Sequence, residues 1–185
     1  MANATQVTTG KVRFSYVNIF EPKAQDNGVE KYSVTLLIPK ADTVTMKKIK
    51  SAIDAAKKVY SEKHNGKSAP GKTTIHDGDG VRPSDGEEFG AECKGHYVMT
   101  VSSKNKPLIV YPDKSLITEP TEVYSGCYGK AIINFFAYET AGNRGISAGL
   151  NGIMKLEDGE PLGGAVITDS DWEQDESFEM DDLLD

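Results

Sequence analysis

The sequence predicts an all-β fold, a small β-barrel with one α-helix, and two observations support this prediction. Short segments rich in β-branched and aromatic residues recur along most of the chain, and turn residues separate them. Residues 42–60 alone have the apolar spacing of an amphipathic helix. Strands that do not alternate with helices argue against the parallel sheet of nucleotide-binding folds. A two-sheet sandwich stays open as an alternative, because periodicity does not determine how strands pair.

Alternation of apolar and polar residues defines the predicted strands. In the first one, residues 11–17, we expect Val12, Phe14 and Tyr16 on one face and the residues between them on the other. Further strands are expected at residues 32–38, 97–101, 108–111, 130–138 and 146–156. Five or more strands with one helix suit a closed or partly open barrel, of which the OB-fold is a common member.

The predicted helix takes Asp42 or Thr43 as its N-cap. Its apolar residues recur at three- or four-residue spacing and are Met46, Ile49, Ile53, Ala56 and Tyr60. Lysines occupy much of the remaining helix surface, at positions 47, 48, 50, 57 and 58. These lysines form either a solvated face or a basic surface for phosphates. The residues that follow, 64–95, are rich in Gly, Pro, Asp and Lys, and we expect them to form one long loop.

The charge is distributed unevenly along the chain. The net charge is −7, but residues 169–185 hold nine acids and no Lys or Arg, so residues 1–168 carry a net charge of +2. Such an asymmetry is typical of a nucleic-acid-binding domain with an interaction tail, although acidic tails occur on chaperones too. The tail cannot bury enough apolar surface to fold alone. We therefore predict an OB-fold domain over residues 1–167 and a disordered acidic tail over 168–185.

Several classes of protein lack support in the sequence. No signal peptide or membrane span is visible, so the expected location is inside a cell. Cys93 and Cys127 lie 34 positions apart, which favours two reduced core thiols over a zinc site or a disulfide. The acidic turn around Asp77 and Asp79 lacks the spacing of a calcium loop. No catalytic constellation appears, and we expect neither an enzyme nor a cofactor nor a metal.

Residues 66–73 match the phosphate-loop pattern G-x-x-x-x-G-K-[ST], but their context argues against that function. A phosphate loop must follow a strand and open a helix, because the helix N-terminus holds the phosphate. Here the match follows the predicted helix, and the glycines of residues 74–80 disfavour another one. A nucleotide-hydrolysing enzyme, which would depend on Lys72, is therefore only a minor alternative.

Basic residues interleaved with aromatic residues are the remaining chemical signal. A single-stranded nucleic acid is bound by cations that follow its phosphates and by flat rings that stack on its bases. On the predicted strand 130–138, alternation assigns Phe135 to the core and Phe136 and Tyr138 to the open face. The candidate contact residues are Lys11, Arg13, Lys104, Lys106, Tyr111, Tyr124, Tyr128, Lys130, Phe136, Tyr138 and Arg144.

Specific runs of sequence resemble a phage family of single-stranded DNA-binding proteins that was formerly of unknown function. The resemblance covers about residues 9–165 and is carried mainly by residues 107–113, 122–131, 134–138, 143–151 and 158–162, with residues 10–16 and 82–87 in agreement. It implies an OB-fold barrel similar to the single-strand binder of T7-like phages. It also implies a role in phage DNA replication or recombination, in the cytoplasm of an infected bacterial host, and transfers no catalytic or metal site.

The resemblance gives the acidic tail an expected role as well. It implies that the tail recruits phage replication proteins such as the polymerase or helicase, and its charge implies that it competes with DNA for the basic face. Tails of this family often end in an aromatic residue, whereas this chain ends in Leu183-Leu184-Asp185. The expected tail residues are Asp169, Asp171, Trp172, Glu173, Asp175, Glu176, Phe178, Glu179, Asp181, Asp182, Leu183, Leu184 and Asp185.

The sequence leaves three further points open. A non-catalytic phage structural or assembly protein would also explain a barrel with a tail, although not the interleaved basic and aromatic residues. RNA binding is compatible with the same residues, because stacking alone does not distinguish the sugars. The oligomeric state is not encoded in any visible pattern, and a homodimer with exchanged tails is compatible with the sequence.

Overall fold

The computed structural model describes residues 4–24, 28–83, 85–140 and 143–162. Its strands are β1 (Gln6–Thr8), β2 (Val12–Ala24), β3 (Glu30–Pro39), β4 (Ile75–Asp77), β5 (His96–Ser103), β6 (Leu108–Val110), β7 (Tyr128–Thr140) and β8 (Asn143–Glu157). Its helices are α1 (Thr43–Lys63) and two 3-10 turns, η1 (Ala91–Cys93) and η2 (Pro120–Glu122). The acidic tail, residues 168–185, lies outside the described residues, and so does the part of the predicted first domain that precedes residue 4 or follows residue 162.

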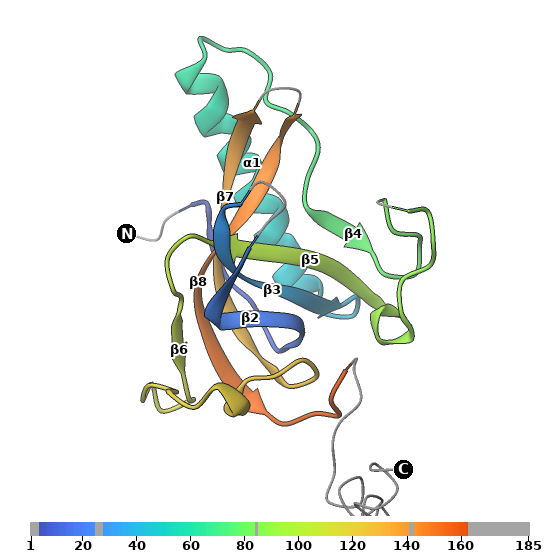
Figure 1. Ribbon diagram of the computed structural model, residues 1–185. Coiled ribbons are helices and arrows are strands. Elements are labelled where there is room, and N and C mark those ends of the chain that lie inside the picture. Colours follow the sequence, from blue (N-terminus) through green and yellow to red (C-terminus); the bar gives the residue numbers. More distant parts are fainter. Residues whose placement is uncertain (1–3, 25–27, 84, 141–142, 163–185) are drawn as a thin grey trace, which may run out of the picture.

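Five of the strands close into a ring (Figure 1). β2 pairs with β3, β3 with β5, β5 with β8, β8 with β7, and β7 again with β2. Every pair is antiparallel except β5 and β8, which run parallel. The short strands β1, β4 and β6 extend this ring along β7, β5 and β8. A five-stranded barrel is the architecture of the OB-fold, so the predicted fold class is confirmed and the sandwich is excluded.

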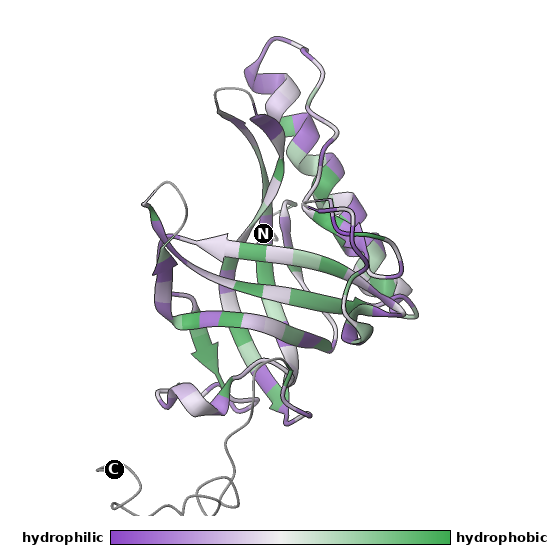
Figure 2. Cartoon of the chain, turned by 45° about the vertical axis from the view of Figure 1, so that its right-hand side comes forward, coloured by the Kyte–Doolittle hydropathy of each residue, from purple (hydrophilic) through white to green (hydrophobic). Residues whose placement is uncertain are grey.

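The interior of the ring is filled by the apolar residues of the alternating strands. Phe14, Leu36, Met99 and Ile133 are fully buried, each on a different strand of the barrel. Figure 2 shows the corresponding bands of apolar and polar residues along the strands. Burying a side chain of this size contributes about 1.5–3 kcal/mol, so alternation along the strands both defines and stabilises the barrel.

Helix α1 lies against β7 beside the barrel, as Figure 1 shows. Asp42 is its N-cap, because an Asp42 carboxylate oxygen accepts a hydrogen bond from the Thr45 amide at 3.0 Å. The predicted apolar face is confirmed, with Ile49, Ile53, Ala56 and Tyr60 buried and Met46 half-buried. The β7–β8 hairpin extends beyond the barrel alongside the second half of this helix (Figure 1).

The alternation predicted for residues 11–17 is wrong after Phe14. Ser15 is buried, whereas Tyr16 has 69% of its surface exposed and does not share the face of Val12 and Phe14. The register between β2 and β3 shifts between Ser15 and Asn18, and Tyr16 has a positive φ of 48°. A bulge of this kind rotates the following side chain to the other face of the strand, and periodicity cannot reveal it.

The long loop predicted for residues 64–95 is also only partly correct. It contains the strand β4, which pairs with β5 opposite residues 97–99, and the 3-10 turn η1. The element that follows residues 66–73 is the strand β4 and not a helix, so the phosphate-loop interpretation lacks its structural context. Cys93 and Cys127 are both buried and free, as the sequence predicts. Within the described ranges, no helix is long and apolar enough to cross a membrane.

Candidate nucleic-acid interface

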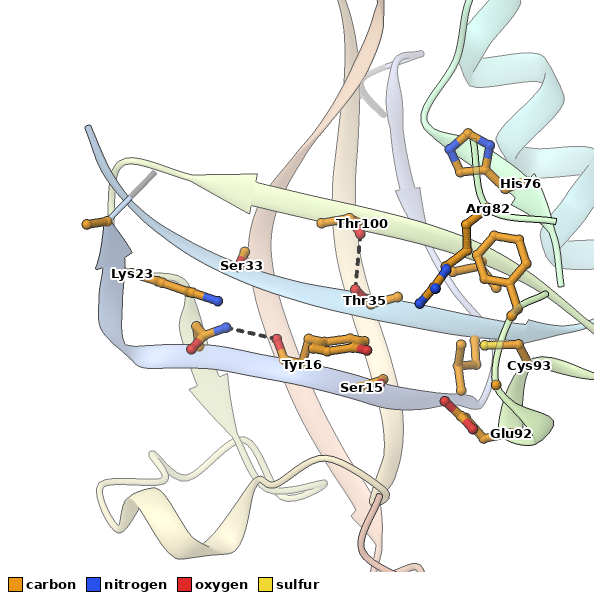
Figure 3. A pocket seen from close by; sticks show the side chains of 16 residues that line it. Ser15, Tyr16, Lys23, Ser33, Thr35, His76, Arg82, Glu92, Cys93 and Thr100 are labelled. Carbon is orange, nitrogen blue, oxygen red and sulfur yellow. Dashed lines mark hydrogen bonds between the residues drawn. The ribbon is translucent and has the colours of Figure 1, made fainter. Parts of the chain in front are cut away.

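A groove of about 480 Å³ crosses the outer face of β2, β3 and β5. Its floor consists of small polar side chains, and Ser15, Thr35 and Thr100 lie in one row across the three strands because their backbones are paired. The hydroxyls of Thr35 and Thr100 are hydrogen-bonded at 3.0 Å (Figure 3). Small side chains keep this floor low enough for a flat ring to approach it. We call this site the strand groove.

Aromatic side chains border the floor of the strand groove. Tyr16 comes from the bulge in β2, His76 from β4, and Phe89 from the loop before η1. The Tyr16 ring is the most exposed of them, and Figure 3 shows it lying over β2 beside Ser15. These rings are suited to stacking on the bases of a single strand.

The bulge that presents Tyr16 is held by hydrogen bonds. The Asn18 side-chain amide donates to the Tyr16 carbonyl at 3.1 Å, and the Val17 amide donates to the Ser125 hydroxyl at 3.2 Å. Both bonds satisfy backbone groups that the interrupted β2–β3 pairing leaves without a strand partner. The orientation of Tyr16 is therefore built into the fold before any ligand arrives.

The guanidinium of Arg82 lines the same groove, and Figure 3 shows its side chain reaching toward Thr35. Its guanidinium donates two hydrogen bonds to Asp85, at 3.1 and 2.6 Å. The Glu87 amide, and after it Arg82, hold the pKa of Asp85 below its ordinary value. A two-point contact of this kind fixes the plane of the guanidinium, which also offers a face for stacking.

The strand groove continues into two neighbouring hollows. His76 also lines a second hollow, together with Lys72, Tyr138 and Ser147. Tyr138 and Ser147 in turn line a third hollow, which reaches Lys31, Lys104 and Phe136. Because neighbouring hollows share residues, they form one surface from β2 across β4 to the β7–β8 hairpin. We call its second and third parts together the hairpin hollow.

Three of the predicted contact residues lie in the hairpin hollow. Phe136 has 45% of its surface exposed, and Tyr138 and Lys104 line the hollow beside it. Phe135 is 2% exposed, so the assignment of Phe135 to the core and of Phe136 and Tyr138 to the open face is confirmed. None of the ion pairs among the described residues involves Lys104, whose ammonium group is available to a phosphate.

A second group of predicted residues lies elsewhere, at the end of the barrel where β7 begins. Lys11 and Arg13 lie over the ring of Tyr128, at 5.1 and 5.4 Å from its centre. Lys11 also forms an ion pair with Glu157, and Arg13 donates hydrogen bonds to the carbonyls of Gly126 (3.0 Å) and Glu160 (2.6 Å). These three residues hold the chain before and after the β7–β8 hairpin, and none of them lines the strand groove.

The remaining predicted residues are spread over the molecule. Tyr111 and Tyr124 are half-buried and pack against the barrel core. Lys106 lies 5.6 Å from the ring of Phe20, and Lys130 is exposed on β7. Arg144 contacts Tyr60 and Glu139 beside the hairpin. The structure therefore brings only part of the predicted set together at one surface.

Sequence reasoning missed Tyr16, His76, Arg82 and Phe89 as candidate contact residues. The last three belong to the segment predicted as a featureless loop, and only the pairing of β4 with β5 places them beside the sheet. Tyr16 was assigned to the face of Val12 and Phe14, from which the bulge removes it. Among the described residues, no cluster of three His, Cys, Asp or Glu side chains could hold a metal ion.

Comparison with known proteins agrees with this arrangement. The model of the family described as the single-stranded DNA-binding protein of Enterobacter phage Enc34 matches residues 5–184. This chain belongs to that family. The resemblance to phage single-stranded DNA-binding proteins, stated from the sequence, is confirmed. The family is described by its binding to DNA and not by a reaction, in agreement with the expectation that the chain is no enzyme.

Individual relatives match over most of their length. The structure of the Enc34 protein in complex with single-stranded DNA is 29% identical and superposes with a TM-score of 0.73, covering 87% of this chain and 91% of that one. Protein p50 of Acyrthosiphon pisum secondary endosymbiont phage 1 is 29% identical over 192 residues, covering 97% of this chain and 98% of its own length. The gp2.5 single-stranded DNA-binding protein of bacteriophage T7 shares the fold, with 16% identity, a TM-score of 0.57 and 95% coverage of both chains.

Proposed function

We propose that this protein binds single-stranded DNA, with little preference for sequence, along the strand groove and the hairpin hollow. The observation that carries the proposal is the continuity of this surface, which has aromatic rings at Tyr16, His76 and Tyr138 above a floor of small side chains. Membership of the Enc34 family supports it, because a solved member is described in complex with single-stranded DNA. Sequence preference is low because a ring can stack on any base.

Binding on this surface combines two physical contributions. Each stacked base contributes about 1–3 kcal/mol, and it does so only when the base is unpaired and its face is accessible. Lysines such as Lys72 and Lys104 contact phosphates and release counterions, so the affinity decreases with salt. A duplex cannot offer its base faces to the rings. The protein therefore prefers single strands to duplexes.

The acidic C-terminal segment has a separate part in the proposal. Its nine acids are attached to a body with a net charge of +2, so at low salt they compete with DNA for basic residues. When DNA displaces the segment, it becomes available to recruit phage replication proteins such as the polymerase or helicase. The protein then acts in phage DNA replication or recombination, in the cytoplasm of the infected bacterial host.

A binding titration tests both parts. The anisotropy of a labelled oligo-dT is measured with the full chain and with residues 1–168, over a salt series and against a duplex competitor. We expect salt-sensitive binding that prefers single strands and is tighter for the truncated chain. An equal affinity of the two chains at low salt would contradict the competition. Binding by neither chain would contradict the DNA function and favour a structural or assembly protein.

A further inference from the structure

A second groove, of about 530 Å³, lies between α1 and the strands β4 and β5. Ile75 of β4 and Tyr97 of β5 line it, whereas their neighbours His76 and Val98 line the strand groove. Successive residues of a strand point to opposite faces, so the two grooves lie on opposite faces of β4 and β5. We call the second one the helix groove. Its volume lies in the usual range of ligand sites.

The floor of the helix groove is apolar and only partly covered. Met46, Ile75 and Tyr97 are half-buried side chains that pack on the barrel core and leave part of their surface open. Beneath them, Ile49 and Ile53 are buried. An open apolar strip between a helix and a sheet edge is suited to apolar side chains of a partner segment.

Lysines border this floor. Lys47, Lys50 and Lys57 of α1 line the helix groove, and none of the ion pairs among the described residues involves them. Lys40 differs, because its ammonium group pairs with the carboxylates of Asp77 at 2.6 Å and Asp79 at 2.7 Å. These carboxylates raise the pKa of Lys40 and offset its positive charge. Asp54 is the acidic side chain of α1 that lines the groove, so its carboxylate offsets one of these three lysines and the helix side of the groove keeps a net positive charge. The helix groove thus combines apolar side chains with an excess of positive charge, and its occupant must carry apolar and acidic side chains together.

The C-terminal segment of this chain has that composition. Residues 169–185 hold nine acids and no Lys or Arg, with an apolar side chain every few residues. These apolar residues are Trp172, Phe178, Met180, Leu183 and Leu184. Single-stranded DNA would satisfy the lysines but would leave Met46 and Ile75 without an apolar partner, and Lys40 already lies over the ring of Tyr97, 5.4 Å from its centre. The composition therefore favours the acidic segment over a nucleic acid in the helix groove.

The length of the chain allows this contact within one molecule. Leu162, the last described residue, packs against the cluster of Leu37, Cys93 and Val98, and Val98 adjoins Tyr97 of the helix groove. Trp172 follows ten residues later, a span of up to about 35 Å when extended. Helix α1 has 21 residues and a length of about 31 Å. Residues 169–185 can therefore reach any point along the groove.

We propose that residues 169–185 dock in the helix groove of their own chain, with their apolar side chains on Met46, Ile75 and Tyr97 and their acids against the bordering lysines. Because the contact is intramolecular, a weak affinity is enough to populate it. Thr73 lines both the helix groove and the hairpin hollow, so a docked segment places negative charge beside the DNA surface. The docking itself does not require that the protein binds DNA. Only the effect of the docked segment on DNA binding rests on the proposed function.

Trp172 is the sole tryptophan of the chain, so its fluorescence reports on docking directly. The experiment compares the emission of the full chain with that of Lys47→Glu/Lys50→Glu and of the matched control Lys48→Glu/Lys58→Glu, at low salt and without DNA. The control has the same net charge, but its two lysines lie outside the helix groove. All four lysines are exposed, so both variants are expected to fold, which circular dichroism verifies.

We expect blue-shifted Trp172 emission in the native chain and the control, and emission typical of a water-exposed indole in the groove variant. The signal should not depend on protein concentration. Equal emission in all three proteins would overturn the proposal, and a shift that grows with concentration would replace it with docking on a second copy. The measurement contains no DNA, so its result does not depend on whether the protein binds DNA. A failure of the docking proposal can therefore be distinguished from a failure of the DNA function.

Discussion

Tyr60 of α1 donates a hydrogen bond to the carboxylate of Glu139 on β7 and thereby joins the helix to the β7–β8 hairpin. Arg144 of β8 completes the contact, because it pairs with Glu139 at 2.9 Å and donates to the Tyr60 hydroxyl at 3.2 Å. His64 stacks on the other side, with its ring centre 4.0 Å from that of Tyr60. This cluster orients the hairpin that carries Phe136 and Tyr138. Arg144, predicted as a DNA contact, has a structural role here.

Replacing Tyr60 with Phe should loosen the hairpin. The hydrogen bond from Tyr60, and after it Arg144, holds the pKa of Glu139 below its ordinary value, so Tyr60→Phe should raise that pKa. The urea midpoint should fall, and hydrogen exchange should accelerate in β7 and β8 beside Glu139 and Arg144. Tyr111→Phe is the control, because Tyr111 also packs against the core, although it is half-buried, and forms no side-chain hydrogen bond among the described contacts. Equal effects of the two changes would contradict this role of Tyr60.

Replacing Tyr16 with Ala should weaken single-strand binding without unfolding the protein. The Tyr16 ring is 69% exposed, so its loss removes little core packing. One stacked base is worth about 1–3 kcal/mol, which corresponds to a decrease in affinity of about 5- to 150-fold. Leu108→Ala serves as the control, since Leu108 is 57% exposed on β6 and lies outside the strand groove. Anisotropy titrations in which Tyr16→Ala binds as tightly as Leu108→Ala would refute the stacking role.

The salt dependence of binding should separate the two groups of predicted basic residues. Lys104 lies in the hairpin hollow without an ion pair, whereas Lys11 is paired with Glu157 at the other end of the barrel. Lys104→Ala should lower the slope of log affinity against log salt by about 0.7, the value for one phosphate contact on a single strand. Lys11→Ala should leave the slope unchanged. The reverse result would move the DNA path to Lys11, Arg13 and Tyr128.

Lys155 should stabilise the fold in a pH-dependent way. Burial of Lys155 opposes its charge, but hydrogen bonds to Asp158 and Glu122 raise its pKa overall. Lys155, and after it Tyr124, lowers the pKa of Asp158 from its ordinary value of 3.8. A lowered carboxyl pKa stabilises the fold above that value, and this stabilisation is lost as the pH falls below it.

The corresponding variant is Lys155→Met, which keeps most of the buried stem and removes the charge. We expect it to be less stable than the native chain at pH 7, with a difference that shrinks as the pH falls from 4 toward 2 in urea titrations. A difference that stays constant or grows in acid would show that the ion pair with Asp158 contributes nothing to the free energy of unfolding.

Regular periodicity made much of the fold predictable. In β3, every second residue from Val34 to Ile38 packs into the barrel core, and α1 keeps one apolar face. Asp42 is a capping residue in an obvious position. β4 could not be predicted, because three residues among glycines and aspartates give no periodic signal. Tyr16 could not be placed, because the bulge depends on the pairing of β2 with β3. Where alternation is regular, as at Phe135 and Phe136, the side-chain direction was predicted correctly.

The candidate site was less predictable than the fold, because its residues come from segments that only tertiary pairing brings together. Composition identifies a basic or aromatic side chain but not its partner. The sequence therefore does not distinguish Lys11 and Arg13 from Lys104. In the structure, Lys11 and Arg13 contact other groups of the protein, and only Lys104 lies in the hairpin hollow. Arg82 and Phe89 reach the strand groove only because β4 pairs with β5.

Photo-crosslinking tests the central claim, that the strand groove and the hairpin hollow bind single-stranded DNA, most directly. An oligonucleotide with photoreactive bases is irradiated with the full chain, and the attached residues are identified by mass spectrometry. The account predicts crosslinks at Tyr16, His76, Phe89 or Tyr138 that a single-stranded competitor removes and a duplex does not. Crosslinks confined to Tyr128 and its surroundings, at the other end of the barrel, would contradict it.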